Sequence, residues 1–343
     1  MKTSKFNFPV IALLAASMMI AIISCDKDDD DDSVTKTTLQ AKITEAATLI
    51  DTTAEGTAEG QYLPGSKTVL QTVITTAQTV YDDATSTQVA VDNTVIALDA
   101  AIDAYEANIV AAIAPEALVA HWTFDDGTGT TLSDFSGNGF DGTFMKQHAD
   151  LGDGIPEWTT DRYGNSGKAL NFKNGSWVKV PYNIALNPKQ ITISLWVNAD
   201  EIRENNKILG LYEWQGYKLQ LQVANKVFFT VNDGVGAWDK DSDLAFIDIN
   251  NWYHIAVTYA SGEMAFFING TEVARETKEG FGDLVTVTGH DFAIGSDIDI
   301  PWDGWTLENG SFFNGSIDEL RIYKSVLTPA QVSSIYQLEK VPE

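Results

Sequence analysis

The hydrophobic periodicity of the chain changes once, near Leu118, and this change constrains the fold more than any other feature of the sequence. Between residues 34 and 113, apolar side chains recur every three or four positions, a spacing typical of amphipathic helices. After Leu118 they recur at every second position, which is typical of strands with one buried face. The sequence therefore predicts a helical domain followed by an all-β domain.

Residues 34–113 carry three apolar stripes, and none of the three helices could bury its stripe alone. The stripes comprise Leu39, Ile43, Ala46 and Ile50, then Leu70, Val73, Ile74, Ala77, Val80 and Tyr81, and finally Val91, Val95, Leu98, Ile102, Tyr105 and Ile109. Thr85 with Gln88 three positions later predicts a capping box before the third helix. We expect a small three-helix bundle with up-down-up order. The helix spacing, with Tyr62 and Ser66 before the second helix, resembles FIVAR-type modules of bacterial surface proteins, which implies a spacer or interaction role.

The alternating segments after Leu118 predict short strands separated by turns. Apolar side chains alternate with polar ones in two clear runs, Ile191, Ile193, Leu195 and Val197, and Tyr217, Leu219, Leu221 and Val223. Asn269-Gly270 predicts a two-residue hairpin, and Thr328 with Gln331 predicts a capped C-terminal helix. The fold expected for residues 118–340 is an all-β sandwich or jelly roll of two sheets.

The N-terminal sequence predicts export of the protein and attachment to a membrane by a lipid. Lys2 and Lys5 precede an apolar run at residues 8–23, and the single cysteine of the chain, Cys25, follows it. Residues 1–24 resemble a lipoprotein signal peptide with a lipobox, so lipidation of Cys25 is expected. Residues 25–33 form an acidic tether like that of surface lipoproteins of the Bacteroidetes type. The resemblance implies an outer-membrane lipoprotein that is exposed at the cell surface.

The overall charge limits the possible partners. The formal net charge is −26 and the isoelectric point is near 4.3. Such a chain repels the phosphates of nucleic acids and anionic lipid headgroups, so neither is expected as a direct ligand.

Residues 121–142 form an acidic, glycine-rich segment, HWTFDDGTGTTLSDFSGNGFDG. Its carboxylates and turn-forming glycines suit a hard cation such as calcium. A solvated surface loop is the alternative, and the segment alone does not decide between the two.

Four separated motifs resemble a LamG-like, concanavalin A-type jelly roll over residues 118–340. They are HWTFDDGTGTTLSDFSGNGFDGTF, ITISLWVNA, NWYHIAVTYASGEMAFFINGTEV and FFNGSIDELRIYKSVLTPAQVSSIY, in the order expected for that family. The resemblance implies two stacked antiparallel sheets, with the N- and C-terminal ends of the domain close together.

The same resemblance implies a structural calcium ion that connects residues 121–142, which we call the early loop, to the last strands of the domain. The candidate ligands are Asp125, Asp134, Asn138 and Asp318. Strict alternation would place Asp318 with Leu320 on the core face and Arg321 on the opposite face. Asp318 would then need a cation or backbone N–H groups as its partner. A hydrogen-bonded turn without metal is the alternative.

The sequence gives no support for catalysis. Laminarinase-like enzymes of concanavalin-type fold carry Glu-x-Asp-x-Glu on one strand, and no such string occurs here. A glycoside hydrolase with dispersed acids is therefore the less favoured alternative.

Tryptophans near Gly- and Asp-rich connections point instead to carbohydrate binding, because indole rings stack on sugars while polar side chains bond hydroxyls. The candidate ligand-binding residues are Trp214, Gln220, Trp238, Trp302 and Trp305. The predicted function is non-catalytic binding of a glycan or polysaccharide. The alternative function is adhesion, in which the domain would bind a surface protein instead of a glycan.

Overall fold

The computed structural model describes residues 34–146, 154–203, 205–242, 247–297 and 312–342. The predicted signal peptide, Cys25 and the acidic tether lie outside the described residues, as do Trp302 and Trp305. Within the described part of the chain, no helix combines the length and apolar composition needed to cross a membrane.

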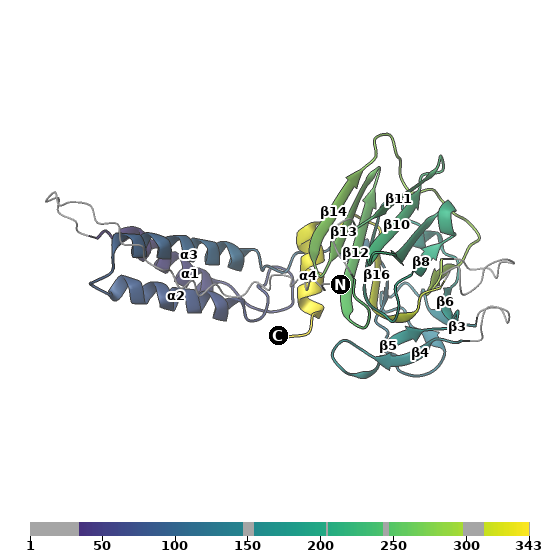
Figure 1. The fold of residues 1–343 in the computed structure, drawn as a ribbon, viewed down its shortest axis with the longest axis horizontal. Coiled ribbons are helices and arrows are strands. Elements are labelled where there is room, and N and C mark those ends of the chain that lie inside the picture. The colour runs from purple at the N-terminus through teal and green to yellow at the C-terminus, as the bar shows by residue number, and fades with distance from the viewer. Residues whose placement is uncertain (1–33, 147–153, 204, 243–246, 298–311, 343) are drawn as a thin grey trace, which may run out of the picture.

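The N-terminal part is the predicted three-helix bundle (Figure 1). Its helices are α1 (Thr37–Thr52), α2 (Ser66–Asp82) and α3 (Gln88–Glu106). They bury one shared core, which comprises Leu39, Ile43, Ala46, Leu70, Ile74, Ala77, Val91, Leu98, Ile102 and Tyr105. The predicted capping box of α3 is wrong, because Thr87 is the N-cap and accepts from the Ala90 amide, while Thr85 bonds the Asp83 carboxylate.

Residues 118–340 form two eight-stranded antiparallel sheets, which we name the back sheet and the front sheet. The back sheet contains β14 (Thr271–Thr277), β13 (Glu263–Ile268), β12 (Trp252–Ala260), β7 (Ile191–Ala199), β16 (Gly315–Tyr323), β5 (Ser166–Phe172) and β4 (Glu157–Thr160) in this order, with β1 (Leu118–Trp122) paired to β16. The front sheet contains β11 (Ala237–Asp241), β10 (Lys226–Asn232), β9 (Tyr217–Gln222), β8 (Asn206–Leu211), β15 (Phe292–Ile294), β6 (Trp177–Val180), β3 (Gly142–Met145) and β2 (Thr131–Leu132). The short helices are η1 (Pro115–Ala117), η2 (Ile184–Leu186) and η3 (Glu213–Gln215).

The core lies between the inner faces of the two sheets. The predicted alternation is confirmed on β7 and on most of β9, where the inward residues belong to one buried cluster, Ile191, Ile193, Leu195, Val197, Tyr217, Leu219 and Leu221. The prediction is wrong for Val223, which lies beyond the end of β9 and is exposed. The predicted hairpin at Asn269-Gly270 is also confirmed, with both residues at positive φ between β13 and β14. The expected fold class, a helical bundle followed by a two-sheet jelly-roll sandwich, is therefore confirmed.

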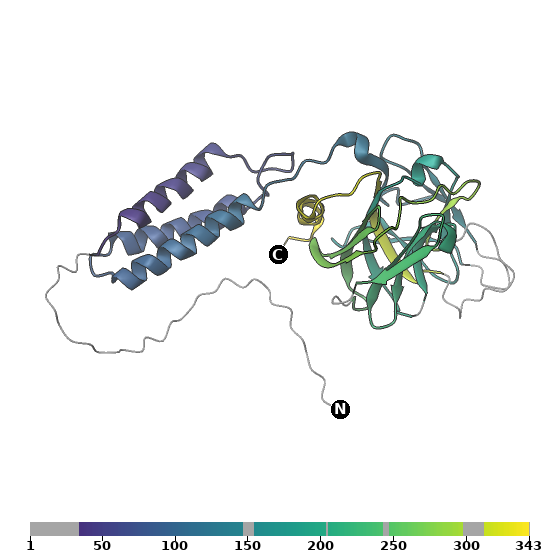
Figure 2. The ribbon, with the colours of Figure 1, turned by 90° about the horizontal axis from the view of Figure 1, so that it is seen from above.

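Helix α4 (Pro329–Glu339) covers the outer face of the back sheet. Its predicted capping box between Thr328 and Gln331 is present. Val332 and Ile335 pack against apolar side chains of that outer face, Ala256, Ala265, Phe267 and Tyr323. Figures 1 and 2 show α4, in yellow, between the helical bundle and the sandwich.

The same helix also contacts the segment that leads from the bundle to β1. The Ser334 hydroxyl accepts from the Ala111 amide at 3.0 Å, and the Gln331 side-chain amide donates to the Ala112 carbonyl. Helix α4 therefore holds both the end of the bundle and the back sheet.

A bulge in β16 changes the predicted placement of Asp318. Glu319 has a φ of 53°, and the register with β7 shifts between Asp318 and Arg321. The bulge keeps Ile317 and Leu320 in the core, whereas Asp318 lies opposite Trp196, whose ring stacks on Tyr336 of α4. The prediction that Asp318 faces the core with Leu320 is wrong, because strict alternation does not hold across a bulge.

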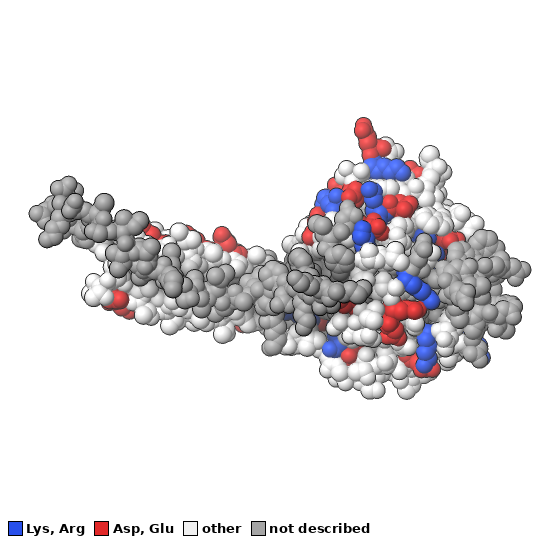
Figure 3. Space-filling view, in the orientation of Figure 1, with Lys and Arg blue, Asp and Glu red and all other residues white. Residues whose placement is uncertain are grey.

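Charged side chains on the surface of the β-domain are mixed in sign. In Figure 3, Lys and Arg lie beside Asp and Glu over this domain, whereas the bundle shows few charges in that view. Ion pairs on this surface include Lys173 with Glu157 at 2.6 Å and Arg275 with Glu272 at 2.7 Å.

Candidate functional site

The candidate site is a group of buried charges on the face of the front sheet that points away from the core. Lys207 of β8 lies with its Nζ 2.5 Å from Oδ2 of Asp297 and 3.8 Å from Oε1 of Glu213 in η3. The Nζ of Lys218, on β9, is 3.8 Å from the same Asp297 oxygen. We call these four residues the front cluster. Their side chains are 1–14 % exposed, so the charges interact in a poorly solvated setting.

Strand alternation explains why two lysines lie on this face. Because Tyr217 and Leu219 point into the core, Lys218 and Gln220 must point outward. The antiparallel register places Lys207 opposite Gln220, and Thr230 opposite Lys218. Adjacent strands therefore bring these polar side chains together.

A glycine lets Asp297 reach the cluster. A Cβ atom on Gly210 of β8 would lie 2.6 Å from the Cβ of Asp297. The backbone at Asp297 therefore crosses directly over β8, and only glycine leaves room for this approach. The Asp297 carbonyl also accepts from the Glu213 amide at 3.1 Å, which ties the crossing segment to η3.

Trp214 supplies an aromatic surface at the edge of the front cluster. Trp214 is 38 % exposed, and the Lys218 ammonium lies 3.6 Å from the centroid of its indole ring. Phe228 packs edge-on against the indole at 6.4 Å between centroids. The turn that presents Trp214 is strained, with Tyr212 and Glu213 at φ values of 57° and 50°. The Asn232 side chain holds it by donating to the Trp214 carbonyl at 2.8 Å.

Four buried polar atoms on this face have no hydrogen-bond partner within the described residues. They are Nζ of Lys218, Oε1 of Gln220, Oγ1 of Thr230 and Oδ1 of Asp297. All four residues are at most 1 % exposed. Since buried polar atoms in folded proteins are nearly always bonded, these atoms are suited to bond hydroxyls or water.

The surroundings of the front cluster also change its protonation. Burial, together with the charge of Lys207, lowers the pKa of Lys218 to about 8. Burial and the negative charge of Asp297 raise the pKa of Glu213. The cluster is thus a set of strongly interacting charges rather than a set of solvated ones.

Comparison with known proteins agrees with this architecture. Residues 172–333 match the family described as the concanavalin A-like lectin/glucanases superfamily. The β-domain has the concanavalin A-like fold. Domain 4 of AbnA, a GH43 extracellular arabinanase from Geobacillus stearothermophilus solved in complex with arabinotriose, is 26 % identical. That match covers 64 % of this chain and 98 % of that one, with a TM-score of 0.51.

Two other solved structures are less similar to this chain. The binding domain of Paraclostridial Mosquitocidal Protein 1 is 17 % identical, with a TM-score of 0.48, and the match covers 65 % of this chain and 52 % of that one. A botulinum neurotoxin type C structure is 15 % identical with a TM-score of 0.46, covering 65 % and 51 %. No curated protein matches the chain.

The concanavalin A-like domain brings together two of the predicted binding residues, Trp214 and Gln220. Trp238 is not available to a ligand, because it is 7 % exposed and packs against Tyr259 and Phe281 in the core. Its position opposite Val231, an inward residue of β10, explains this correction. The sequence reasoning missed Lys207, Glu213, Thr230 and Asp297, and only the lysine and glutamine of the alternating β9 run signalled a polar outer face.

The predicted calcium ligands do not fit a calcium ion. Oδ1 of Asp134 accepts from the His121 and Ser136 amides at 3.0 and 2.9 Å, and its Oδ2 accepts from the Phe140 amide. Asn138 donates its side-chain amide to the Val119 carbonyl at 2.8 Å. Backbone donors thus bond both carboxylate oxygens of Asp134. These hydrogen bonds are those expected of the hydrogen-bonded turn, and a bound calcium stays a prediction.

The other two candidates are paired with cations of the protein. Asp318 forms an ion pair with Arg162, and Asp125 lies 3.6 Å from the Nζ of Lys168. Across the described ranges, no group of three or more His, Cys, Asp or Glu side chains could hold a metal. The partner expected for Asp318 was a bound cation or backbone N–H groups of residues 121–142, whereas the structure pairs it with the guanidinium of Arg162.

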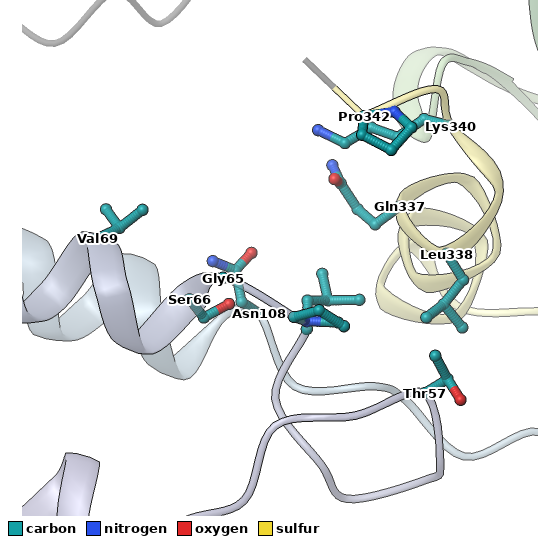
Figure 4. A pocket seen from close by; sticks show the side chains of 11 residues that line it. Thr57, Gly65, Ser66, Val69, Asn108, Gln337, Leu338, Lys340 and Pro342 are labelled. Carbon is teal, nitrogen blue, oxygen red and sulfur yellow. The ribbon is translucent and has the colours of Figure 1, made fainter.

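A cleft of about 670 Å³ lies between the bundle and the end of α4 (Figure 4). Val69, Ser66 and Asn108 line it from the bundle, and Gln337 and Lys340 line it from the C-terminal side. None of the described residues that line it has a carboxylate or an aromatic ring, in contrast to the front cluster with Trp214.

Proposed function

We propose that the concanavalin A-like domain binds carbohydrate without cleaving it, on the outer face of the front sheet around Trp214. One observation carries the proposal: a partly exposed indole lies beside buried polar atoms that have no partner of their own. The ring can stack on the C–H face of a sugar, and the polar atoms can bond its hydroxyls. The similarity to an arabinanase domain solved with arabinotriose supports the same class of ligand.

The arrangement of the carboxylates favours binding over hydrolysis. A glycosidase needs one acid that protonates the leaving oxygen and a second carboxylate that acts on the sugar or on water. Here Asp297 and Glu213 lie near the same ammonium, Lys207 Nζ. Asp297 is therefore paired with a lysine in the structure.

The test is titration calorimetry with neutral and acidic oligosaccharides selected on a glycan array. We expect Trp214→Ala to weaken binding at least tenfold. Phe135→Ala is the matched control, because Phe135 is an exposed aromatic residue in the loop between β2 and β3. The proposal fails if the array shows no glycan binding, or if chromatography shows that the bound oligosaccharide is cleaved.

We also propose that the chain is a surface lipoprotein and that the bundle is a spacer. The support is the sequence of residues 1–33, with Cys25 after the apolar run and the aspartates behind it. Labelling cells with a fatty-acid analogue should mark the wild-type chain and not Cys25→Ala. Protease digestion of intact cells then tests exposure at the surface.

A further inference from the structure

The front cluster is electrically balanced, and this balance restricts the ligand. It contains two ammonium groups, Lys207 and Lys218, and two carboxylates, Glu213 and Asp297. Each charge already has an opposite charge within 3.8 Å. An additional charge brought to this site would be poorly solvated and would find no unpaired counter-charge in the cluster.

The free atoms of the site favour a group that both donates and accepts. The Lys218 ammonium can only donate, whereas Oδ1 of Asp297 and Oε1 of Gln220 can only accept. Donor and acceptor lie close together, because the Lys218 Nζ is 3.8 Å from the other oxygen of Asp297. Two neighbouring hydroxyls of a sugar match such a pair, since each hydroxyl can donate to one atom and accept from another.

A carboxylate or sulfate does not match this pair. It could accept from Lys218, but it would then lie beside Oδ1 of Asp297, which carries negative charge and accepts no hydrogen bond from the described residues. An amino sugar would bond Asp297 but would meet the ammonium of Lys218. Either charged ligand therefore meets a like charge at the distance where a hydroxyl would form a hydrogen bond.

We infer that the site around Trp214 selects a neutral sugar unit with at least two adjacent free hydroxyls, and discriminates against uronic acids and sulfated sugars. This inference rests on the proposed carbohydrate binding. It adds the chemical class of the ligand and assigns recognition of the hydroxyls to Lys218 and Asp297, with the Trp214 ring at the edge of the site.

The experiment compares one polysaccharide in three forms with the full chain. The neutral glycan that binds best on the array is oxidised at its primary hydroxyls to the carboxylate, and a portion is then converted to the methyl ester. The ester keeps the added size and removes the charge. We expect the free acid to bind at least tenfold more weakly than the ester, as measured by calorimetry. Binding of the acid as tight as that of the ester, or an array on which only anionic glycans bind, overturns the inference while leaving carbohydrate binding intact.

Two variants test the assigned residues. Asp297→Asn should weaken binding of the neutral glycan and narrow the difference between acid and ester. Because that change could unfold the domain, Thr230→Val provides a nearly isosteric second variant next to Lys218. We expect Thr230→Val to weaken neutral binding threefold or more with an unchanged circular dichroism spectrum. If both variants fold and bind like the wild type while Trp214→Ala does not, the polar atoms do not contact the ligand and the inference fails. If no glycan binds at all, the proposed function itself fails.

Discussion

Arg162 and Asp318 form an ion pair in which the two side chains are only 4 % and 3 % exposed. Arg162 lies in the turn between β4 and β5, and Asp318 lies before the bulge of β16. The same guanidinium donates its Nε–H to the carbonyl of Glu339 at 2.7 Å and lies 4.8 Å from the ring centroid of Trp196. This pair therefore joins a hairpin, a central strand and the end of α4.

Removing the positive charge of this pair should destabilise the β-domain strongly. Arg162→Met leaves Asp318 buried without a counter-charge, and we expect the free energy of unfolding to fall by about 3–5 kcal/mol. Guanidinium denaturation followed by tryptophan fluorescence measures the change. Lys168→Met is the control, because Lys168 is 43 % exposed and 3.6 Å from Asp125, and it should have little effect. A change in Arg162→Met no larger than in the control would contradict the role of the pair.

The last turn of α4 depends on Glu339. Its carboxylate lies 2.5 Å from Nη1 of Arg321 and accepts from the Trp196 indole at 2.9 Å. Glu339→Ala leaves Arg321, which is largely buried, without this acceptor, and we expect about 2 kcal/mol of destabilisation. Amides of α4 should then exchange with deuterium faster than in Lys340→Ala, since Lys340 follows the helix. Equal exchange rates in the two variants would show that Glu339 does not hold the helix.

Acid should destabilise the domain through His254. Burial, aided by the charges of Arg321 and Arg162, lowers the pKa of His254 from 6.5 to about 3. The unfolded chain therefore binds a proton between these pH values that the folded chain does not bind, so stability falls as the pH decreases from 6.5 toward 3. The loss is on the order of a few kcal/mol.

His254→Gln tests this pH dependence. Glutamine can still bond the Ser194 hydroxyl, which lies 2.8 Å from Nε2 of His254. The slope of unfolding free energy against pH should decrease by about one proton between pH 6 and pH 4. A wild-type slope in His254→Gln would refute the assignment.

Asp134 should stabilise the early loop without metal. Burial opposes its ionisation, but the amides of His121, Phe140 and Ser136 lower the pKa of its carboxyl below the usual range. Its contribution to stability is therefore present above the unfolded pKa of 3.8 and is lost as the pH falls further. We expect Asp134→Ala to cost about 1–3 kcal/mol at pH 7. The melting temperature should be the same in calcium and in EDTA, and a rise of several degrees in calcium would restore the metal hypothesis.

Local features of the sequence predicted most of the fold. Alternation predicted the strands β7 and β9, Asn269-Gly270 predicted the hairpin, and Thr328 with Gln331 predicted the start of α4. These features depend on the periodicity of the backbone and on neighbours a few positions apart, which a sequence records directly. The indole of Trp214 and the outward Gln220 could be proposed on the same basis.

The tertiary structure alone decided the partners of the buried charges. Asp318 pairs with Arg162, which lies 156 positions away in the sequence. A bulge at Glu319 places Asp318 on the side of the sheet that α4 covers. Asp297 reaches Lys207 across 90 positions because Gly210 lets the backbone cross β8. Pairing of this kind depends on strand order, register and the path of the chain over a sheet. Periodicity says which face a side chain is expected to occupy, but only the folded chain determines which charges meet there.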